Sequence, residues 1–289
     1  MLKNYIKLLR INHYIKNILV LVPLACSGQL FNTQKFISGI WGGVTFSLIS
    51  SAVYIINDIN DRKKDSLHPT KCHRPIASGL ISIKNAIFLA SILFVISIST
   101  SILNFDIMPT MLVIIYFCLN IFYSFGLKNI PIVDITILAA GFLIRVFYGA
   151  LITGIEVSNW LYLTILTMSF SLAFGKRRNE LKYIAASNVR LVLRYYPENF
   201  LDKFMYVCLG LTNVFYAFWC IDEKTVAHYG NDKLIFTVPL ILLITMKYSL
   251  NIESQENGDP VEIIFNDAAL SALCVCYFFV MFMILYVCK

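Results

Sequence analysis

The segment Tyr54–Gly79, YIINDINDRKKDSLHPTKCHRPIASG, lies where an apolar run over 39–56 gives way to charged residues. If a helix continues through this segment, Asp58, Asp61 and Asp65 stand at positions i, i+3 and i+7, which places three carboxylates on one helical face. Carboxylates this close repel one another unless a cation shares them, and Mg²⁺ prefers such hard oxygen ligands, completed by water and substrate phosphate. The sequence therefore predicts a Mg²⁺ site formed by Asn57, Asp58, Asp61 and Asp65.

Basic residues follow the acidic residues directly. Lys71 and Arg74 stand in the same segment, and a guanidinium can pair two phosphate oxygens at once. A metal site with basic neighbours is suited to a diphosphate group. The alternative is a solvated run of charges at a membrane surface.

Composition indicates a polytopic membrane protein. Hydrophobic residues make up 58% of the 289 residues and charged residues only 14%, which is unlike a soluble chain of this length. Apolar runs of about 17 to 22 residues are each long enough for a helix to cross a bilayer. They lie at 17–34, 37–56, 85–104, 108–124, 132–152, 158–174, 203–221, 233–250 and 267–288. We expect an all-α protein with about nine transmembrane helices, forming a single domain over 1–289.

The distribution of basic residues predicts the orientation in the membrane. With the N-terminus in the cytoplasm, all of the 24 Lys and Arg residues fall on the cytoplasmic side except Lys35, Arg145, Lys224, Lys233 and Lys289. We therefore expect a multi-pass protein of the cell inner (plasma) membrane whose active site faces the cytoplasm. The net charge of +7 favours anionic lipid or phosphate partners at that face, and not nucleic acid.

Further candidate residues lie at the ends of other apolar runs. Lys16 stands at the entry to the first run, where it either binds substrate or extends to the membrane surface. Tyr123, Ser124 and Lys128 form a compact group around Gly126 that is suited to an anion, although a lone lysine can also serve only to orient the chain.

The remaining candidate residues lie in two different settings. Arg145 lies within an apolar run, where an ionisable group is costly and is therefore expected to have a functional or structural partner. Lys176, Arg177 and Glu180 follow the sixth run, and an Arg and a Glu at i and i+3 either pair with each other or bring a further acid to the first motif.

Taken together, these motifs resemble the UbiA-type superfamily of intramembrane prenyltransferases. The resemblance is carried by IKNILVLVPLA (15–25), NDINDRKKDSLHPTKCHRPIASG (57–79), YSFGLKNIPIVDITILAAGFLIRVFYGA (123–150), FGKRRNELK (174–182) and GDPVEIIFND (258–267). Within the superfamily, the chain is more similar to the polyprenyl-phosphate phosphoribosyltransferases, of the decaprenyl-phosphate type, than to the aromatic prenyltransferases. The resemblance covers most of the chain.

The resemblance implies a helical bundle around a central cavity and a Mg²⁺-dependent transferase of cell envelope biosynthesis. The donor would be 5-phosphoribosyl 1-diphosphate and the acceptor a polyprenyl phosphate, and a homo-oligomer is expected by analogy. The catalytic residues would be Asp58, Asp61, Asp65, Lys176 and Arg177. The substrate-binding residues would be Lys16, Asn57, Lys71, Arg74, Tyr123, Ser124, Lys128, Arg145 and Glu180.

Two other functions fit part of the pattern. A UbiA-type prenyltransferase would move an isoprenyl group from its diphosphate to an aromatic or other acceptor. That enzyme would need a second acidic loop after the sixth run, where this chain has only Glu180, Glu198 and Asp202 among many bases. A non-enzymatic transport or lipid-binding protein would place its ionisable groups at mid-membrane depth, whereas here nearly all of them lie at one face.

Overall fold

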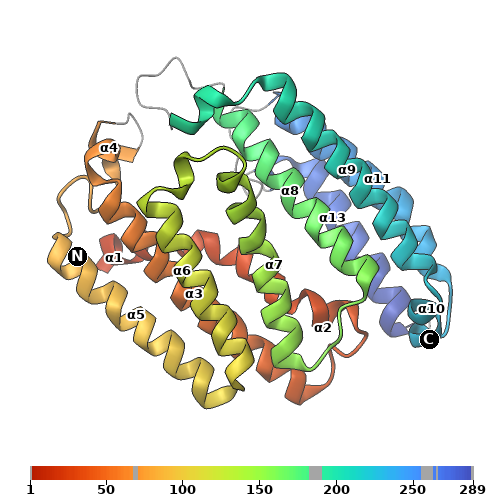
Figure 1. The fold of residues 1–289 in the computed structure, drawn as a ribbon. Coiled ribbons are helices and arrows are strands. Elements are labelled where there is room, and N and C mark those ends of the chain that lie inside the picture. Colours follow the sequence, from red (N-terminus) through yellow and green to blue (C-terminus); the bar gives the residue numbers. More distant parts are fainter. Residues whose placement is uncertain (1, 68–70, 182–190, 255–262, 265, 288–289) are drawn as a thin grey trace. The chain divides into compact units, whose positions relative to one another are not determined.

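The structure is a computed structural model that describes residues 2–67, 71–181, 191–254, 263–264 and 266–287. Within these ranges the chain is helical with short connections and contains no β-strand, which confirms the all-α prediction (Figure 1). Four positions of the predicted motifs, His68, Pro69, Thr70 and Lys182, lie outside the described residues, as does most of the segment 258–267.

The chain forms two compact units. The first comprises residues 1–137 and 144–156, and the second comprises 138–143 and 157–289. The expected single domain over 1–289 therefore stays a prediction, as does the central cavity.

Most of the first unit is built from long helices joined by short 3₁₀ segments. Its elements are α1 (Leu2–Leu9), η1 (Ile11–Leu21), α2 (Val22–Cys26), α3 (Thr33–Asn60), α4 (Arg62–Ser66), η2 (Lys71–His73), α5 (Ile83–Asn104), α6 (Ile107–Phe125), η3 (Leu127–Asn129) and α7 (Val133–Thr153). Helix α3 packs against both α5 and α6. Residues 138–143 of α7 belong to the second unit.

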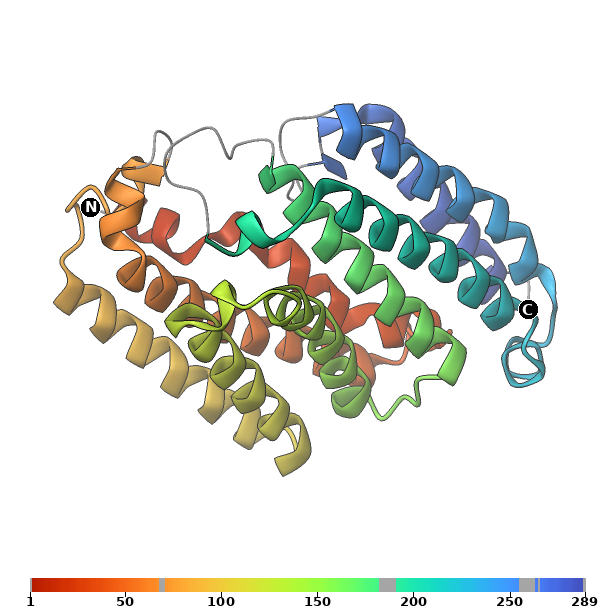
Figure 2. The ribbon, with the colours of Figure 1, turned by 45° about the horizontal axis from the view of Figure 1, so that its top comes forward.

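The second unit is also helical. Its elements are α8 (Asn159–Leu181), η4 (Leu191–Tyr195), α9 (Glu198–Ile221), α10 (Glu223–Tyr229), η5 (Lys233–Thr237), α11 (Val238–Ser254), α13 (Ala268–Phe282) and the π-helical turn η6 (Met283–Val287). Helices α8 and α9 run side by side, as do α11 and α13 (Figure 2).

Seven helices in the described ranges are long and apolar enough to cross a membrane, so the predicted count of nine is not confirmed. The apolar run 17–34 does not form one long helix. It is divided among η1, the short helix α2, which has Pro23 in its first turn, and a turn that precedes α3. The run 158–174 does form a long helix, α8, but Thr164, Thr167, Ser169 and Ser171 and its charged end make that helix more polar.

Close helix packing in both units depends on glycine. A Cβ at Gly149 of α7 would lie 1.9 Å from the backbone oxygen of Val20, so η1 can lie directly on α7 only because this position has no side chain. In the second unit, a Cβ at Gly175 of α8 would lie 2.8 Å from a methyl carbon of Ile252 in α11. Hydroxyl groups also join the helices there, since Thr212 of α9 donates to Thr167 of α8 at 2.9 Å.

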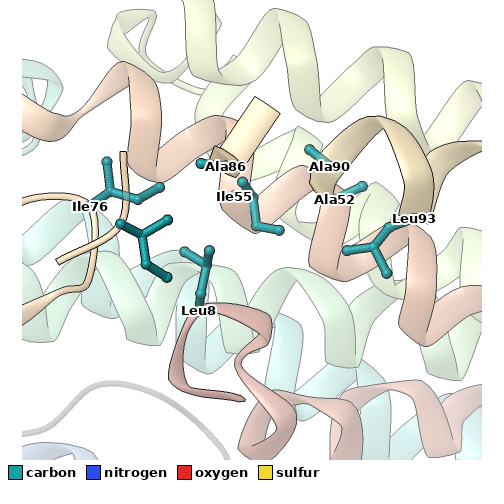
Figure 3. Close-up of a cluster of buried hydrophobic side chains, with 8 residues drawn as sticks. Leu8, Ala52, Ile55, Ile76, Ala86, Ala90 and Leu93 are labelled. Carbon is teal, nitrogen blue, oxygen red and sulfur yellow. The ribbon is translucent and has the colours of Figure 1, made fainter. Parts of the chain in front are cut away.

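A buried apolar cluster lies beside the charged end of α3. Figure 3 shows Leu8 of α1, Ile55 of α3 and Ile76 of the segment after η2 pointing toward one another, together with small residues of α5. Leu8 and Ile55 have no exposed surface, and Ile76 is 1% exposed. The cluster therefore holds α1 and the segment after η2 close to the position where Asp58 follows on α3.

Candidate active site

The acidic motif does not lie on one continuous helix. Helix α3 ends at Asn60, and α4 begins at Arg62 after Asp61, whose ψ is near 2°. The backbone N–H of Asp61 still donates to Asn57 at 2.9 Å, and that of Asp65 donates to Asp61 at 2.8 Å, so the chain continues with a change of direction. Asp58 and Asp65 share Arg74 as a partner, whereas Asp61 pairs with Lys128, so only two of the three carboxylates meet the same base.

Asp58 and Asp65 face the arginines. Asp58 is 3% exposed, and its Oδ1 accepts hydrogen bonds from Nη2 of Arg10 at 2.5 Å and from Nη1 of Arg74 at 3.1 Å. The same Nη1 of Arg74 donates to Oδ2 of Asp65 at 2.6 Å. Arg74 thus bridges two carboxylates, and its predicted contact with a diphosphate stays a prediction. Lys71 lies half-buried in the short η2 segment three residues before it.

Asn57 and Asp61 face the end of α6. Lys128 donates to Oδ1 of Asp61 at 2.6 Å, and the Ser124 hydroxyl donates to the amide oxygen of Asn57 at 3.1 Å. The side-chain amide of Asn60 donates to the backbone oxygen of Ser124 at 2.6 Å, which satisfies one of the last carbonyls of α6. The structure therefore brings Ser124 and Lys128 to the motif. Tyr123, beside Ser124, is buried.

Arg10 belongs to this site although sequence reasoning did not select it. Its backbone adopts a left-handed conformation, φ 55° and ψ 49°, which an arginine rarely takes and which no sequence pattern signals. The guanidinium lies over the Tyr54 ring, 5.1 Å from its centroid, in addition to its pairing with Asp58. Lys7 fixes the preceding turn by donating to the backbone oxygen of His73 at 3.0 Å.

Arg145 is enclosed by protein groups in the first unit. It is 5% exposed, and it donates to the Asn17 side chain at 2.9 Å and to the Tyr116 hydroxyl at 3.0 Å. Its guanidinium also lies 5.0 Å from the centroid of the Phe46 ring. These contacts join α7 to η1, α6 and α3, which matches the structural partner expected for a charge in an apolar run. Lys16, next to Asn17, is half-buried, and substrate binding by Lys16 or Arg145 stays a prediction.

The candidates of the second unit lie at the end of α8. Arg177 has no exposed surface and donates to Glu180 at 2.6 Å, which confirms the predicted i, i+3 pairing. Lys176 is half-buried. Arg178 pairs with Asp202 at 3.0 Å and with Glu198 at 3.4 Å. Together with the Arg177–Glu180 pair, these contacts engage all three acids that the sequence offers for a second metal motif. That Lys176, Arg177 and Glu180 act at the motif of the first unit stays a prediction.

Comparison with known proteins identifies the family. A model of the UbiA prenyltransferase family matches residues 18–190, more than half of the chain, and this range includes the motifs at 57–79, 123–128 and 174–182. The chain belongs to the UbiA prenyltransferase family. Among family members, it is 32% identical to the decaprenyl-phosphate phosphoribosyltransferase of Corynebacterium glutamicum, over 98% of this chain and 86% of that protein.

Other UbiA proteins agree with this assignment. The chain is 30% identical to the decaprenyl-phosphate phosphoribosyltransferase of Mycolicibacterium smegmatis, over 93% of this chain and 88% of that protein. Its fold matches that of a UbiA homolog from Archaeoglobus fulgidus, solved bound to GPP and Mg²⁺. The TM-score is 0.74 at 19% identity, over 96% of this chain and 99% of the other. This likeness confirms the UbiA-like fold.

The donor set at the motif fits Mg²⁺. No three His, Cys, Asp or Glu side chains in the described ranges gather closely enough to hold an ion among themselves. Mg²⁺, however, is commonly held by one or two carboxylates together with substrate phosphates. Asn57 and Asp61 offer an amide and a carboxylate oxygen from adjacent turns, and the Asp61 side chain is 20% exposed. The oxygen chemistry therefore suits the ion, with phosphate completing its shell.

Proposed function

We propose that this protein transfers a 5-phosphoribosyl group from 5-phosphoribosyl 1-diphosphate to a polyprenyl phosphate at the membrane. The observation that carries the proposal is the 32% identity over nearly the whole chain to a decaprenyl-phosphate phosphoribosyltransferase. The site supports it, because Arg10, Arg74 and Lys128 converge with three aspartates at the end of α3. A diphosphate donor needs this combination of metal-binding acids and phosphate-binding bases.

The basic residues would bind and orient the two anionic substrates. Arg74 contacts Asp58 and Asp65, and Lys128 contacts Asp61, so the diphosphate of the donor would lie between these two bases. Mg²⁺ held at Asn57, Asp58, Asp61 and Asp65 would stabilise the negative charge that builds up on the leaving diphosphate. Lys71, Lys176 and Arg177 would supply further positive charge toward the donor.

The acceptor needs little activation. A lipid phosphate is already anionic at neutral pH, so its oxygen can attack the anomeric carbon without a general base, and correct positioning contributes most of the rate enhancement. The isoprenoid tail would stay in the bilayer beside the apolar helices. We further propose that the protein lies in the cell inner membrane with this site on the cytoplasmic face, as the distribution of basic residues indicates. A homo-oligomer is proposed by analogy only.

A transfer assay tests the proposal. Purified protein in detergent would be incubated with radiolabelled phosphoribosyl diphosphate and a short polyprenyl phosphate, with and without Mg²⁺, and the lipid phase counted. Label in the lipid phase only when Mg²⁺ is present is expected. Transfer from an isoprenyl diphosphate, with no use of phosphoribosyl diphosphate, would instead establish the prenyltransferase interpretation. Binding of polyprenyl phosphate without any transfer would favour the transport or lipid-binding interpretation.

A matched pair of variants sharpens this assay. Lys128→Ala removes a base that donates to Asp61 of the motif. Lys63→Ala removes an exposed base on α4 and serves as the control. Activity should fall in the first variant and stay near wild type in the second. Equal activity in the two variants would contradict the placement of the donor between Arg74 and Lys128.

A further inference from the structure

We infer that a polar seam between η1 and α3 receives the sugar phosphate of the donor and selects it over an isoprenyl chain. The polar seam consists of Tyr14 and Asn17 of η1, Ser47 and Ser51 of α3, and Arg145 of α7. The inference rests on the proposed function, because it assigns to these residues the part of the donor that lies beyond its diphosphate.

Helix α3 carries its members of the polar seam on the same face as Asp58. Four polar side chains recur there at intervals of four, three and four residues: Ser47, Ser51, Tyr54 and Asp58. This spacing places them on one side of the helix. From Ser47 to Asp58 the helix axis rises by about 16 Å. The polar seam therefore begins near the charged end of α3 and continues into its apolar, membrane-spanning part.

The 3₁₀ segment η1 meets this face with polar side chains of its own. The Tyr14 hydroxyl lies 2.8 Å from Oγ of Ser51, within hydrogen-bond distance, and the Asn17 amide donates to Oγ of Ser47 at 3.0 Å. Tyr14 and Asn17 stand three residues apart, which is one turn of a 3₁₀ helix, so both face α3. The unusual conformation of η1 thus brings its two polar residues to the serines.

Arg145 supplies a positive charge where Asn17 meets α3. It donates through Nε to the Asn17 side chain at 2.9 Å and through Nη2 to the Tyr116 hydroxyl at 3.0 Å. Its guanidinium also lies 4.9 Å from the centroid of the Tyr116 ring. An arginine keeps its positive charge in proteins. The polar seam therefore contains a fixed cation, which favours a negatively charged 5-phosphate over an uncharged isoprenyl chain.

Neighbouring positions of α3 pack by apolar contacts instead. Ile49 and Val53 belong to one buried apolar cluster, and Ala52 and Ile55 belong to another. An ionisable group in a membrane-spanning segment is costly, and such groups often mark substrate sites. Polar contacts between membrane helices can also act only as packing contacts, and the variants described below distinguish the two roles.

The exposure of the polar seam agrees with contact to a ligand. Tyr14 and Ser47 are half-buried, whereas Ser51 has no exposed surface and Asn17 is 4% exposed. A hydroxyl group both donates and accepts, so Tyr14 and Ser47 can hydrogen-bond a sugar while Ser51 and Asn17 fix their orientation. Ser51, Asn17 and Arg145 are therefore positioning residues. A site that hydrogen-bonds a hydroxylated substrate strongly rejects an analogue without those groups, since its polar atoms are then left unpaired.

Binding of three diphosphates to the full chain in detergent tests the inference. Calorimetry with Mg²⁺ present gives the dissociation constants of inorganic pyrophosphate, phosphoribosyl diphosphate and geranyl diphosphate. In the wild type, phosphoribosyl diphosphate should bind at least about tenfold more tightly than pyrophosphate, and geranyl diphosphate should bind no more tightly than pyrophosphate. The ratio to pyrophosphate isolates the contribution of the group beyond the diphosphate.

Variants of the polar seam should reduce this ratio without changing pyrophosphate binding. Arg145→Met should lower the preference for phosphoribosyl diphosphate over pyrophosphate about tenfold, and Tyr14→Phe and Ser47→Ala about threefold or more. Each should leave the dissociation constant of pyrophosphate within about twofold of wild type. If Arg145→Met does not fold, Tyr14→Phe removes only one hydroxyl group and keeps the test decisive.

Ser51→Ala and Ser97→Ala form a matched pair. Both serines have no exposed surface, and each hydroxyl donates to a backbone oxygen at 2.9 Å, that of Leu9 for Ser51 and that of Thr45 for Ser97. Only Ser51 belongs to the polar seam, so Ser51→Ala should lower the preference for phosphoribosyl diphosphate and Ser97→Ala should not. Equal ratios in the two variants would contradict the inference.

Two further results would overturn the inference. One is a wild-type preference for phosphoribosyl diphosphate that persists in Tyr14→Phe, Ser47→Ala and Arg145→Met alike. The other is a parallel loss of pyrophosphate and phosphoribosyl diphosphate binding in these variants, which would show a packing role only. Failure of the proposed function would appear differently, as a wild type that binds phosphoribosyl diphosphate no more tightly than pyrophosphate.

Discussion

Removing the positive charge of Lys128 should destabilise the first unit by leaving Asp61 without its cation. The Lys128 ammonium lies 2.6 Å from Asp61 Oδ1, and the two side chains are 9% and 20% exposed. Breaking a fully buried ion pair by deleting one partner costs about 3 to 5 kcal/mol, but water can still reach part of the Asp61 carboxylate. We therefore expect Lys128→Met to lower the free energy of unfolding by about 2 to 3 kcal/mol.

A double-mutant cycle isolates this interaction. Asp61→Asn alone leaves the Lys128 ammonium buried without its carboxylate, so it should also destabilise the protein. In the double variant neither charge remains, and its loss of stability should be smaller than the sum of the two single losses by about 1 to 3 kcal/mol. Exposed Lys63→Met should stay within about 0.5 kcal/mol of wild type.

Denaturant unfolding in detergent, followed by tryptophan fluorescence, measures the four free energies of the cycle. Unfolding must be reversible and carried out at one ionic strength, because surface charges respond to salt more strongly than buried ones. Additive single losses, within about 0.5 kcal/mol, would refute the reasoning, because the two groups would then act independently despite their 2.6 Å separation.

Other predictions concern both units. Lys176→Ala should lower kcat/KM for phosphoribosyl diphosphate about tenfold to a hundredfold through KM, with a smaller change for the lipid acceptor; an equal loss in exposed Lys203→Ala would argue against a specific contact. Gly149→Ala should lower the thermal midpoint, because its Cβ would lie 1.9 Å from the Val20 oxygen, whereas Gly43→Ala, with open space around its Cβ, should not. The Leu270 backbone N–H and the Lys247 ammonium hold the pKa of Asp267 below its usual range. The contribution of Asp267 to the free energy of unfolding should therefore be fully present above the pKa of the unfolded chain, about 3.9. It should be lost as the pH falls through the lower pKa of the folded protein. Asp267→Asn should remove this part of the pH dependence of the thermal midpoint. If the thermal midpoint of the variant depended on pH as that of the wild type does, the assignment to Asp267 would be contradicted. In a cysteine-free background, Ser66→Cys should react with a membrane-impermeant maleimide only from the cytoplasmic side and Glu223→Cys only from the opposite side; the reverse pattern would overturn the predicted orientation.

The sequence supports those predictions that depend on local composition and spacing. Apolar runs of bilayer length led to the all-α fold, since a membrane segment must satisfy its backbone hydrogen bonds internally. The spacing of Arg177 and Glu180 predicted their ion pair, because residues three apart in a helix are neighbours on its surface. The motifs at 57–79 and 123–128 resemble those of the UbiA superfamily, and the family comparison confirms the assignment.

Predictions that extended a local pattern beyond one helix were less accurate. The phase of Asp58, Asp61 and Asp65 assumed an unbroken helix, but α3 ends at Asn60 and α4 begins at Arg62. Asp58 and Asp65 share Arg74, whereas Asp61 pairs with Lys128. The count of nine spans assumed that each apolar run is one helix, but 17–34 is divided among shorter elements. Hydropathy reports how apolar a segment is and not whether its backbone continues straight.

Sequence alone determined that charged residues would gather where α3 ends, because the apolar run stops at Ile56 and a diphosphate-type motif follows. Only the tertiary structure decided which base pairs with which acid. Arg10 lies 48 positions from Asp58, and Lys128 lies 67 positions from Asp61. These pairs form because packing of Leu8 and Ile76 on Ile55, and the hydrogen bond from Asn60 to the end of α6, bring distant segments to one place. Salt screens the attraction between exposed charges beyond about 10 Å, so charges select their partners once apolar packing has brought the segments together.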